Sequence, residues 1–454
     1  MRAYERFLRY AAVHTTSAYD TDCVPSTACQ LDLARLLADE MKQMGLDGVH
    51  VDEYGVVYGF LPATPGCEDK PALGFIAHMD TSCSYSGEGV RPQIIEHYDG
   101  GDVVLKGTGD VLRVSEFPTL AGLKGMTLIT SDGTTLLGAD DKAGIAEILT
   151  ACEAVIASGA PHGKLCIAFT PDEEIGMGVA HFDVKKFGAA FAYTVDGGKE
   201  GEIAYETFNA CSASVEISGV SVHPGSSKDT MINAVLVAMT FNAMLPAADI
   251  PRMTEGYEGF FHLESMQGDV EHAQMHYIVR DHDRSMFEHR KQMLRHAAKT
   301  INERYGKEIV TLTIKDSYYN MAEQIAPHMH LVEDARKAVT AAGMTPCVEP
   351  VRGGTDGCRL SYMGLPTPNL CTGGFAFHGR FEHIAVESMD RCCRARSSLS
   401  KCSRYCRGEQ PNCRANPLFK YLMSEKPQAM LMSRSVKSVS RRSWRAFSHR
   451  IFIR

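Results

Sequence analysis

Three short apolar runs, each ending in acidic or histidine residues, constrain the fold of this chain most strongly. Residues 72–77 run into the letters HMD, residues 165–170 into PDEE, and residues 191–195 into DGG. Continuous apolar runs of this length are typical of strands that are covered on both faces. Helical periodicity over residues 143–158 lies between two of these runs. The pattern predicts an α/β fold with helices on both faces of the sheet.

A second pattern interrupts the first between residues 208 and 318. Here the sequence predicts a strand, an amphipathic helix, a hairpin that turns at residues 267–269, a second helix and a last strand. This β-α-β-β-α-β order is that of a ferredoxin-like unit. We therefore expect residues 1–207 and 319–389 to form one domain in two parts, and residues 208–318 to form an inserted domain.

Polar side chains gather where the predicted strands end. The carboxyl ends of adjacent strands are where an α/β sheet builds its site. Mixed histidine and carboxylate ligands suit zinc and, less selectively, cobalt or manganese. So many acids without neighbouring lysines or arginines would repel one another, and a pair of divalent cations removes that conflict. The candidate residues are His78, Asp80, Asp140, Asp141, Glu173, Glu174, Asp196 and His378.

Each of these motifs has a simpler explanation when it is taken alone. His-x-Asp occurs often by chance, Asp140-Asp141 is typical of a helix cap, and Glu173-Glu174 is typical of a solvated loop. Asp196 before two glycines is typical of a turn. The metal-site interpretation rests on all four motifs occurring in one order along one predicted sheet edge. For Asp141, helix capping is the favoured role.

Eight segments of the chain match a known family. They are HMDT, LLGADDKAGIAEI, FTPDEEIGMG, YTVDGG, VHPG, MHYIVRD, RGGTDG and the HG of FAFHG. Over residues 1–389 the chain resembles the tripeptide aminopeptidase branch of the M20 di-zinc peptidases. The resemblance implies a mixed-sheet catalytic domain, an inserted lid and dimerisation domain, two Zn2+ per subunit and a homodimer. It also implies that the N-terminal residue is released from tripeptides by attack of a metal-bridging water.

The resemblance further implies a role for each metal ligand. His78 and Asp196 would bind one zinc ion. Glu174 and His378 would bind the other, and Asp140 would bridge both. Together these five residues make up the expected metal site.

Three further residues receive catalytic roles from the resemblance. Asp80 would orient the imidazole of the preceding histidine ligand. Glu173 would be the general base that takes a proton from the attacking water. His223, in the inserted domain, would stabilise the oxyanion from a lid or from a partner subunit, and a plain surface histidine is the alternative.

Two arginines are candidates for binding the substrate carboxylate. Arg280 ends a predicted strand and Arg352 lies in a glycine-rich loop. Either could hold the terminal carboxylate of a peptide with two parallel hydrogen bonds. For Arg280, an ion pair with Asp281 or Asp283 is nearly as well supported.

Residues 390–454 depart from the family pattern, which continues with an amphipathic helix. This segment contains 16 Lys and Arg against 3 Asp and Glu, and 5 of the 15 cysteines. Its basic composition is compatible with nucleic-acid binding, but a shifted reading frame near residue 390 explains it better. We expect it to be mostly disordered, to destabilise the body by replacing a packing helix, and to be unnecessary for the chemistry.

Composition excludes several other classes of protein. Residues 1–389 contain 31 Lys and Arg against 52 Asp and Glu, so this acidic body would repel nucleic-acid phosphates. No apolar run approaches the ~18 residues of a membrane-spanning helix, and the N-terminus does not resemble a secretory signal. Dispersed cysteines without a C-x-x-C pair indicate free thiols in a reducing cytosol. We expect a cytoplasmic protein whose partners are short peptides.

Two alternatives to a tripeptide aminopeptidase stay open. One is another M20-type hydrolase, such as a dipeptidase, a carboxypeptidase or an N-deacylase. The other is a non-catalytic binder, which would be either a metal-free peptide-binding protein or a nucleic-acid binder that uses the basic tail. The complete ligand set argues against the first kind of binder, and the acidic body argues against the second.

Overall fold

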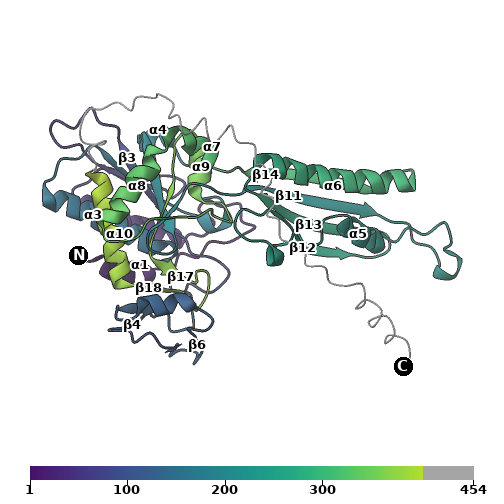
Figure 1. Ribbon diagram of the computed structural model, residues 1–454, viewed down its shortest axis with the longest axis horizontal. Coiled ribbons are helices and arrows are strands. Elements are labelled where there is room, and N and C mark those ends of the chain that lie inside the picture. Colours follow the sequence, from purple (N-terminus) through teal and green to yellow (C-terminus); the bar gives the residue numbers. More distant parts are fainter. Residues whose placement is uncertain (402–454) are drawn as a thin grey trace, which may run out of the picture. The chain divides into compact units, whose positions relative to one another are not determined.

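A mixed eight-stranded sheet forms the centre of the larger domain in the computed structural model, which describes residues 1–401 (Figure 1). The strand order is β1-β2-β8-β3-β9-β16-β10-β15, with β3 parallel to β8 and β9 and with β2 antiparallel to β8. The predicted α/β class is confirmed. The strands are β1 Asp47–Val51, β2 Val57–Leu61, β3 Leu73–His78, β8 Leu165–Thr170, β9 Phe191–Gly197, β10 Glu202–Ala204, β15 Cys347–Val348 and β16 Asn369–Cys371.

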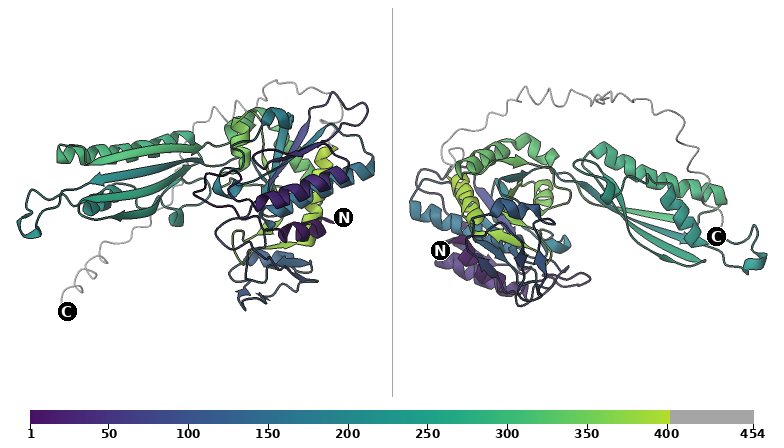
Figure 2. Two further views of the ribbon diagram at one scale, coloured as in Figure 1. Left: turned by 180° about the vertical axis from the view of Figure 1, so that it is seen from behind. Right: turned by 60° about the horizontal axis from the view of Figure 1, so that its bottom comes forward.

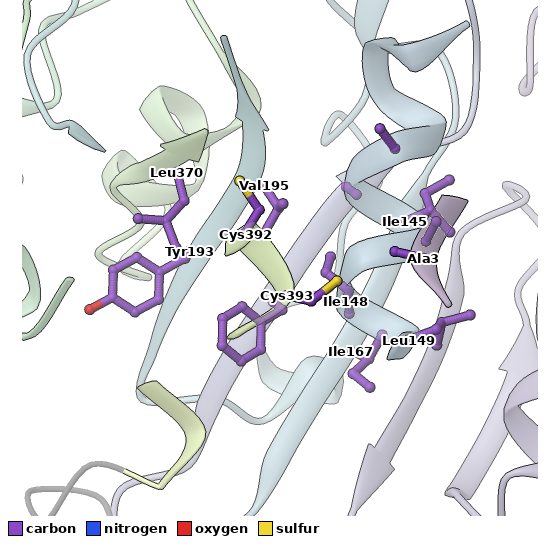
Figure 3. Packing of buried hydrophobic residues seen from close by; sticks show 14 of the residues in the cluster. Ala3, Ile145, Ile148, Leu149, Ile167, Tyr193, Val195, Leu370, Cys392 and Cys393 are labelled. Carbon is purple, nitrogen blue, oxygen red and sulfur yellow. The ribbon is translucent and has the colours of Figure 1, made fainter. Parts of the chain in front are cut away.

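Helices cover both faces of this sheet. Successive side chains of a buried strand point to opposite faces, and each face is covered by an apolar core. In β3 every residue is buried; Phe75 faces one core and Ile76 faces the other. Figure 3 shows residues of the first core, among them Ile145 and Ile148 of α3 and Val195 of β9. The helices that contribute most residues to this core are α1 Ala3–Ala11, α2 Gln30–Gln43, α3 Ala139–Ser158, α8 His330–Ala341 and α10 Val386–Ser400. Two helices line the other: α4 Val184–Phe187 and α9 Asp356–Tyr362.

A smaller four-stranded sheet, in the order β17-β18-β7-β4, carries the loop that contains His378. This sheet was not expected from the sequence, because strands of two or three residues show no alternation of polar and apolar side chains. Its strands are β4 Gln93–Ile95, β7 Leu128–Thr130, β17 Gly374–Phe375 and β18 His383–Ala385. The other short elements are β5 Val103–Val104, β6 Val111–Leu112, α7 Ala322–Ile325, η1 Pro118–Leu123, η2 Glu173–Ile175, η3 Pro224–Ser226, η4 Pro251–Met253 and η5 Ala326–His328.

The inserted domain has a sheet and a core of its own. Its antiparallel strands follow the order β12-β13-β11-β14, and Figure 2 shows them from two directions. Phe241 of α5 and Leu294 of α6 pack on the same core as Met275 of β13. The elements are β11 Asn209–Ser218, α5 Ala234–Ala243, β12 Phe260–Gly268, β13 His272–Asp281, α6 Arg284–Tyr305 and β14 Val310–Tyr318.

Helix α10 corrects the boundary that was expected at residue 390. The helix continues to Ser400, and Cys392, Ala395 and Leu399 are buried on one face of it. Their spacing of three and four residues makes this face apolar, although the segment looks polar overall. The expectation of disorder is therefore wrong for residues 390–400. For residues 402–454 this expectation lies outside the described residues. No helix among residues 1–401 combines the length and the apolar character that crossing a bilayer requires.

Candidate metal centre

Five predicted ligands come together at one edge of the large sheet. His78 is the last residue of β3, Asp196 lies near the end of β9, and Glu174 follows β8 in η2. Because these three strands are parallel neighbours, their carboxyl ends meet at the same edge. Asp140 reaches this edge from the first turn of α3, and His378 reaches it from the β17–β18 loop.

The carboxylate of Asp140 lies between two histidines. Its Oδ1 atom is 2.9 Å from Nε2 of His78, and its Oδ2 atom is 3.0 Å from Nε2 of His378. On the first side, Oδ1 of Asp196 lies 3.6 Å from the same His78 nitrogen. On the second side, Oε2 of Glu174 lies 3.0 Å from the His378 nitrogen. Each oxygen of Asp140 thus faces a separate histidine–carboxylate pair, an arrangement suited to two cations that share one carboxylate.

Burial and charge shift the pKa values of this cluster in opposite directions. Burial raises the pKa of Asp196 to about 7 and also raises the pKa of Glu174. Burial works against ionisation of Asp140 too, but hydrogen bonds from His378 and His78 bring its pKa below the ordinary value. The same contact with Asp140, together with one to Glu174, raises the pKa of His378 to about 11. Without a metal, protons must supply the positive charge that these acids need.

The donor set fits a pair of divalent cations. Oε1 of Glu174 is buried and has no hydrogen-bond partner among the described residues. A buried polar atom without a partner is costly, and a cation in contact with it removes that cost. Histidine nitrogens combined with carboxylate oxygens are ligands that zinc and related metals accept.

Asp80 supports both halves of the cluster. Its carboxylate oxygens accept hydrogen bonds from the backbone N–H groups of Glu173 (2.9 Å) and Glu174 (3.2 Å). Oδ1 of Asp80 also lies 3.4 Å from Nδ1 of His78, the ring nitrogen that faces away from the cluster. The closer contact of this His78 nitrogen is the backbone carbonyl of Asp80, 3.1 Å away. Asp80 therefore holds the His78 ring through its backbone, and its carboxylate holds the turn that carries the two glutamates.

Comparison with known proteins identifies the family. Residues 132–400 match the family described as Peptidase family M20/M25/M40. The Peptidase T of Geobacillus kaustophilus is 54% identical over 387 residues, which cover 85% of this chain and 94% of that protein. The chain belongs to the M20 peptidases. The resemblance inferred from the sequence is thereby confirmed.

Solved structures of M20 peptidases share this fold. The aminopeptidase PepT of Bacillus cereus superposes with a TM-score of 0.71 at 23% identity, over 88% of this chain and 97% of that one. The YXEP protein of Bacillus subtilis, described as a dinuclear metal-binding peptidase of the M20 family, has a TM-score of 0.59 at 13% identity, over 88% and 98% of the two chains.

Two acidic residues of this M20 peptidase have roles that the sequence analysis missed. Asp141 was expected to cap α3, but its Oδ1 has no hydrogen-bond partner among the described residues, and its Oδ2 accepts the backbone N–H of His78 at 3.2 Å. Glu382 is buried, and its carboxylate accepts the N–H groups of Leu137, Gly138 and Asp140 at 2.7, 2.8 and 3.0 Å. Nothing in the sequence marks Glu382, because it lies 242 residues from Asp140 along the chain.

His223 is not part of the cluster in this M20 peptidase. It is exposed in the inserted domain, and its Nδ1 accepts a hydrogen bond from the N–H of Gly225 at 3.1 Å. Its place is compatible with either alternative, a surface histidine or a residue that acts on another subunit.

The two arginines differ in how their guanidinium groups are used. Arg352 donates to the carbonyls of Gly256 and Glu258 at 2.8 and 2.9 Å, and to the hydroxyl of Thr254 at 2.9 Å. These contacts give it a structural role and argue against the expected carboxylate clamp.

Arg280 is half-buried, and its Nη1 donates to the carbonyls of Cys211 and Val279 at 3.2 and 3.0 Å. The ion pairs considered for it are absent among the described residues, because Asp281 pairs with Arg290 and Asp283 caps α6. Arg280 makes these bonds through Nη1, whereas Arg352 uses both Nη1 and Nη2, so Arg280 is the stronger of the two candidates for binding a substrate carboxylate.

Proposed function

We propose that this chain is a dinuclear zinc aminopeptidase that releases the N-terminal residue of tripeptides. The observation that carries the proposal is the position of Asp140, whose two oxygens face two separate histidine–carboxylate pairs. The name Peptidase T, borne by relatives at 52–54% identity, supports tripeptides as the substrate class. The free thiols of all twelve described cysteines support a cytosolic location.

Five residues would hold the metal pair. His78 and Asp196 would hold one ion, Glu174 and His378 the other, and Asp140 would hold both. When bound, two such ions supply Lewis-acid polarisation of the scissile carbonyl and make a water molecule more acidic. The choice of zinc follows from the donor atoms, because histidine nitrogen and carboxylate oxygen are its usual ligands in hydrolases.

Glu173 would be the residue that moves the proton. It lies beside Glu174 in η2, and the Asp80 carboxylate fixes its backbone N–H. Adjacent side chains point in different directions, so one glutamate can bind metal while the other faces the substrate. Glu173 would accept a proton from the attacking water and donate it to the leaving amine.

The inserted domain would complete the site. Arg280 would bind the C-terminal carboxylate of the tripeptide, and His223 of a second copy would stabilise the charge that develops on the carbonyl oxygen. A homodimer is supported by the outer face of α5, where Leu236 and Met239 are 60% and 58% exposed. Soluble proteins rarely expose such side chains together without a partner, and we take the partner to be a second copy of this chain.

One experiment separates the proposed function from its rivals. The metal content of the purified protein is measured alongside hydrolysis of trialanine, N-acetyl-trialanine, dialanine and N-acetylalanine. We expect two metal ions per chain, selective cleavage of free trialanine, loss of activity on chelation and recovery with zinc. Equal cleavage of the acetylated tripeptide indicates an endopeptidase or a deacylase, and preference for dialanine indicates a dipeptidase. Full activity after complete chelation contradicts the metal-dependent mechanism.

A further inference from the structure

Two buried asparagines join the chain segments that enter and leave the inserted domain. The chain enters this domain through residues 207–209 and leaves it through residues 320–322. Asn209 is fully buried and Asn320 is 9% exposed. Buried amides are found where their hydrogen bonds are satisfied, so the partners of these two side chains show what they hold together.

Asn209 connects the entry segment to two other parts of the chain. Its Oδ1 accepts the backbone N–H of Asn320 at 3.0 Å, which ties the entry segment to the exit segment. Its Nδ2 donates to the carbonyls of Asp281 and His282, both at 3.0 Å. These two carbonyls lie at the end of β13, so one side chain joins three segments that are far apart in sequence.

Asn320 makes the complementary connections from the exit segment. Its Oδ1 accepts the N–H groups of Thr207 at 2.9 Å and Ala322 at 3.0 Å. Its Nδ2 donates to the carbonyl of His282 at 3.1 Å. Both asparagines therefore use donor and acceptor atoms at once, which an amide allows and a carboxylate does not.

The end of β13 is where the inserted domain presents Arg280. Arg280 immediately precedes Asp281, and its Cα is paired with those of Ala210 on β11 and Phe260 on β12. A shift of the carbonyls that Asn209 and Asn320 hold would therefore move the base of the Arg280 side chain. Displacement of a binding group by about 1 Å is enough to cost a large factor in rate.

We propose that Asn209 and Asn320 are positioning residues that hold the end of β13, so that Arg280 meets the C-terminal carboxylate of the bound tripeptide. This inference rests on the role proposed above for Arg280. It predicts that changing either asparagine reduces the preference for a free C-terminal carboxylate over a C-terminal amide, in addition to any effect on stability.

The test compares free trialanine with trialanine amide in four variants. Asn209→Asp removes two donors that face carbonyl oxygens, and Asn320→Asp removes one donor while keeping both accepted bonds. Arg280→Ala removes the proposed carboxylate ligand. Asn242→Asp is the matched control in the same domain, because Asn242 is an exposed residue whose Oδ1 accepts the hydroxyl of Tyr277, and an aspartate retains that bond. Thermal unfolding establishes that each variant is folded at the assay temperature.

The measured quantity is the ratio of kcat/KM for the free acid to kcat/KM for the amide. We expect a wild-type ratio of ~10–100, because a charge-assisted hydrogen bond is lost on amidation. Arg280→Ala and Asn209→Asp lower this ratio towards one, Asn320→Asp lowers it less, and Asn242→Asp leaves it unchanged. A merely structural role would lower both rates together and leave the ratio unaltered.

Three results overturn the inference. An unchanged ratio in Arg280→Ala removes the proposed role of that arginine, and this inference with it. An unchanged ratio in folded Asn209→Asp, when Arg280→Ala has lost its preference, overturns the positioning role alone. Failure of both aspartate variants to fold shows that the pair determines the fold and does not position a ligand.

Discussion

The guanidinium of Arg396 and the carboxylate of Glu147 form a fully buried ion pair, with Nη2 and Oε2 3.3 Å apart and neither side chain more than 1% exposed. Nη1 of Arg396 also donates to the carbonyl of Cys392 at 2.9 Å, and Nη2 donates to the carbonyl of Cys371. The oxygens of Glu147 have no hydrogen-bond partner among the described residues. The pair joins α10 to α3, the helix that carries Asp140, in a position where apolar side chains would normally pack.

Removing one partner of this ion pair should lower the stability of the fold strongly, whereas replacing both partners with apolar side chains should not. Arg396→Met leaves the Glu147 carboxylate buried without a counter-charge, and we expect a loss of about 3–5 kcal/mol in the free energy of unfolding. Adding Glu147→Leu should restore most of that loss. Urea unfolding measures both, with the exposed Arg394→Met on the same helix as a control that changes stability by less than ~0.5 kcal/mol. A double variant no more stable than the single one contradicts this account.

Glu382 should control metal affinity without touching the metal. The carboxylate of Glu382 accepts the backbone N–H groups of Leu137, Gly138 and Asp140, and Glu382→Gln replaces one of its two oxygens with an amide nitrogen. Residues that orient metal ligands typically affect affinity by ~10–100-fold, and we expect a loss of that size in a zinc titration. Glu387→Gln is the matched control, because Glu387 also accepts a backbone N–H, that of Thr127 at 2.8 Å, away from the cluster. Equal affinities in the two variants would show that the Glu382 contacts do not matter.

The metal-free protein should become less stable as the pH rises from about 5 to about 8. Burial raises the pKa of Asp196 and of Glu382 to about 7, and that of Asp356 to about 6. Such carboxyls bind their protons more tightly in the folded state than in the unfolded state, where their pKa values are near 4. Their contribution to stability is complete below the unfolded value and is lost as the pH rises through the folded one.

Chemical unfolding of the chelated protein at several pH values measures this loss. Saturating zinc replaces the protons and should stabilise the protein more at pH 8 than at pH 5. A chelated protein that is equally stable at both pH values contradicts the prediction.

Two inactive variants should restore activity when they are mixed. If His223 acts on the neighbouring subunit, a dimer of one His223→Ala chain and one Glu173→Gln chain contains one site with both wild-type residues. Mixing equal amounts under conditions of subunit exchange should recover about a quarter of wild-type activity, since half the chains enter mixed dimers with one intact site of two. If the subunits are shown to exchange but no activity is recovered, His223 either acts in the site of its own subunit or has no role in catalysis.

Truncation should separate α10 from the residues that follow it. A chain that ends at Lys401 keeps every site residue and the whole of α10, so we expect unchanged kcat/KM and an unchanged melting temperature. A chain that ends at Met389 loses the buried Cys392 and Leu399 and should not fold stably, since burial of Leu399 alone is worth about 1.5–3 kcal/mol. Loss of activity in the longer truncated chain, with folding intact, would assign a function to residues 402–454.

Local pattern in the sequence was sufficient for the fold class and for the chain segments that form the site. Strands β3, β8 and β9 are apolar in consecutive positions, so their existence and their burial on both faces follow from neighbouring residues. The position of the polar residues after these strands could also be predicted, because the residues that directly follow neighbouring parallel strands lie at the same edge of the sheet.

Tertiary structure decided the features that depend on contacts between distant segments. Only the folded chain places the two oxygens of Asp140 against two histidines, and only there does Glu382 reach the N–H of Asp140 across 242 residues. The same holds for α10, whose apolar face is visible only against the core that it covers, and for Arg352, whose donors are taken by carbonyls of another loop. Sequence pattern reports periodicity over a few residues, whereas the partner of a buried charge or hydrogen-bond donor is set by the packing of the whole domain.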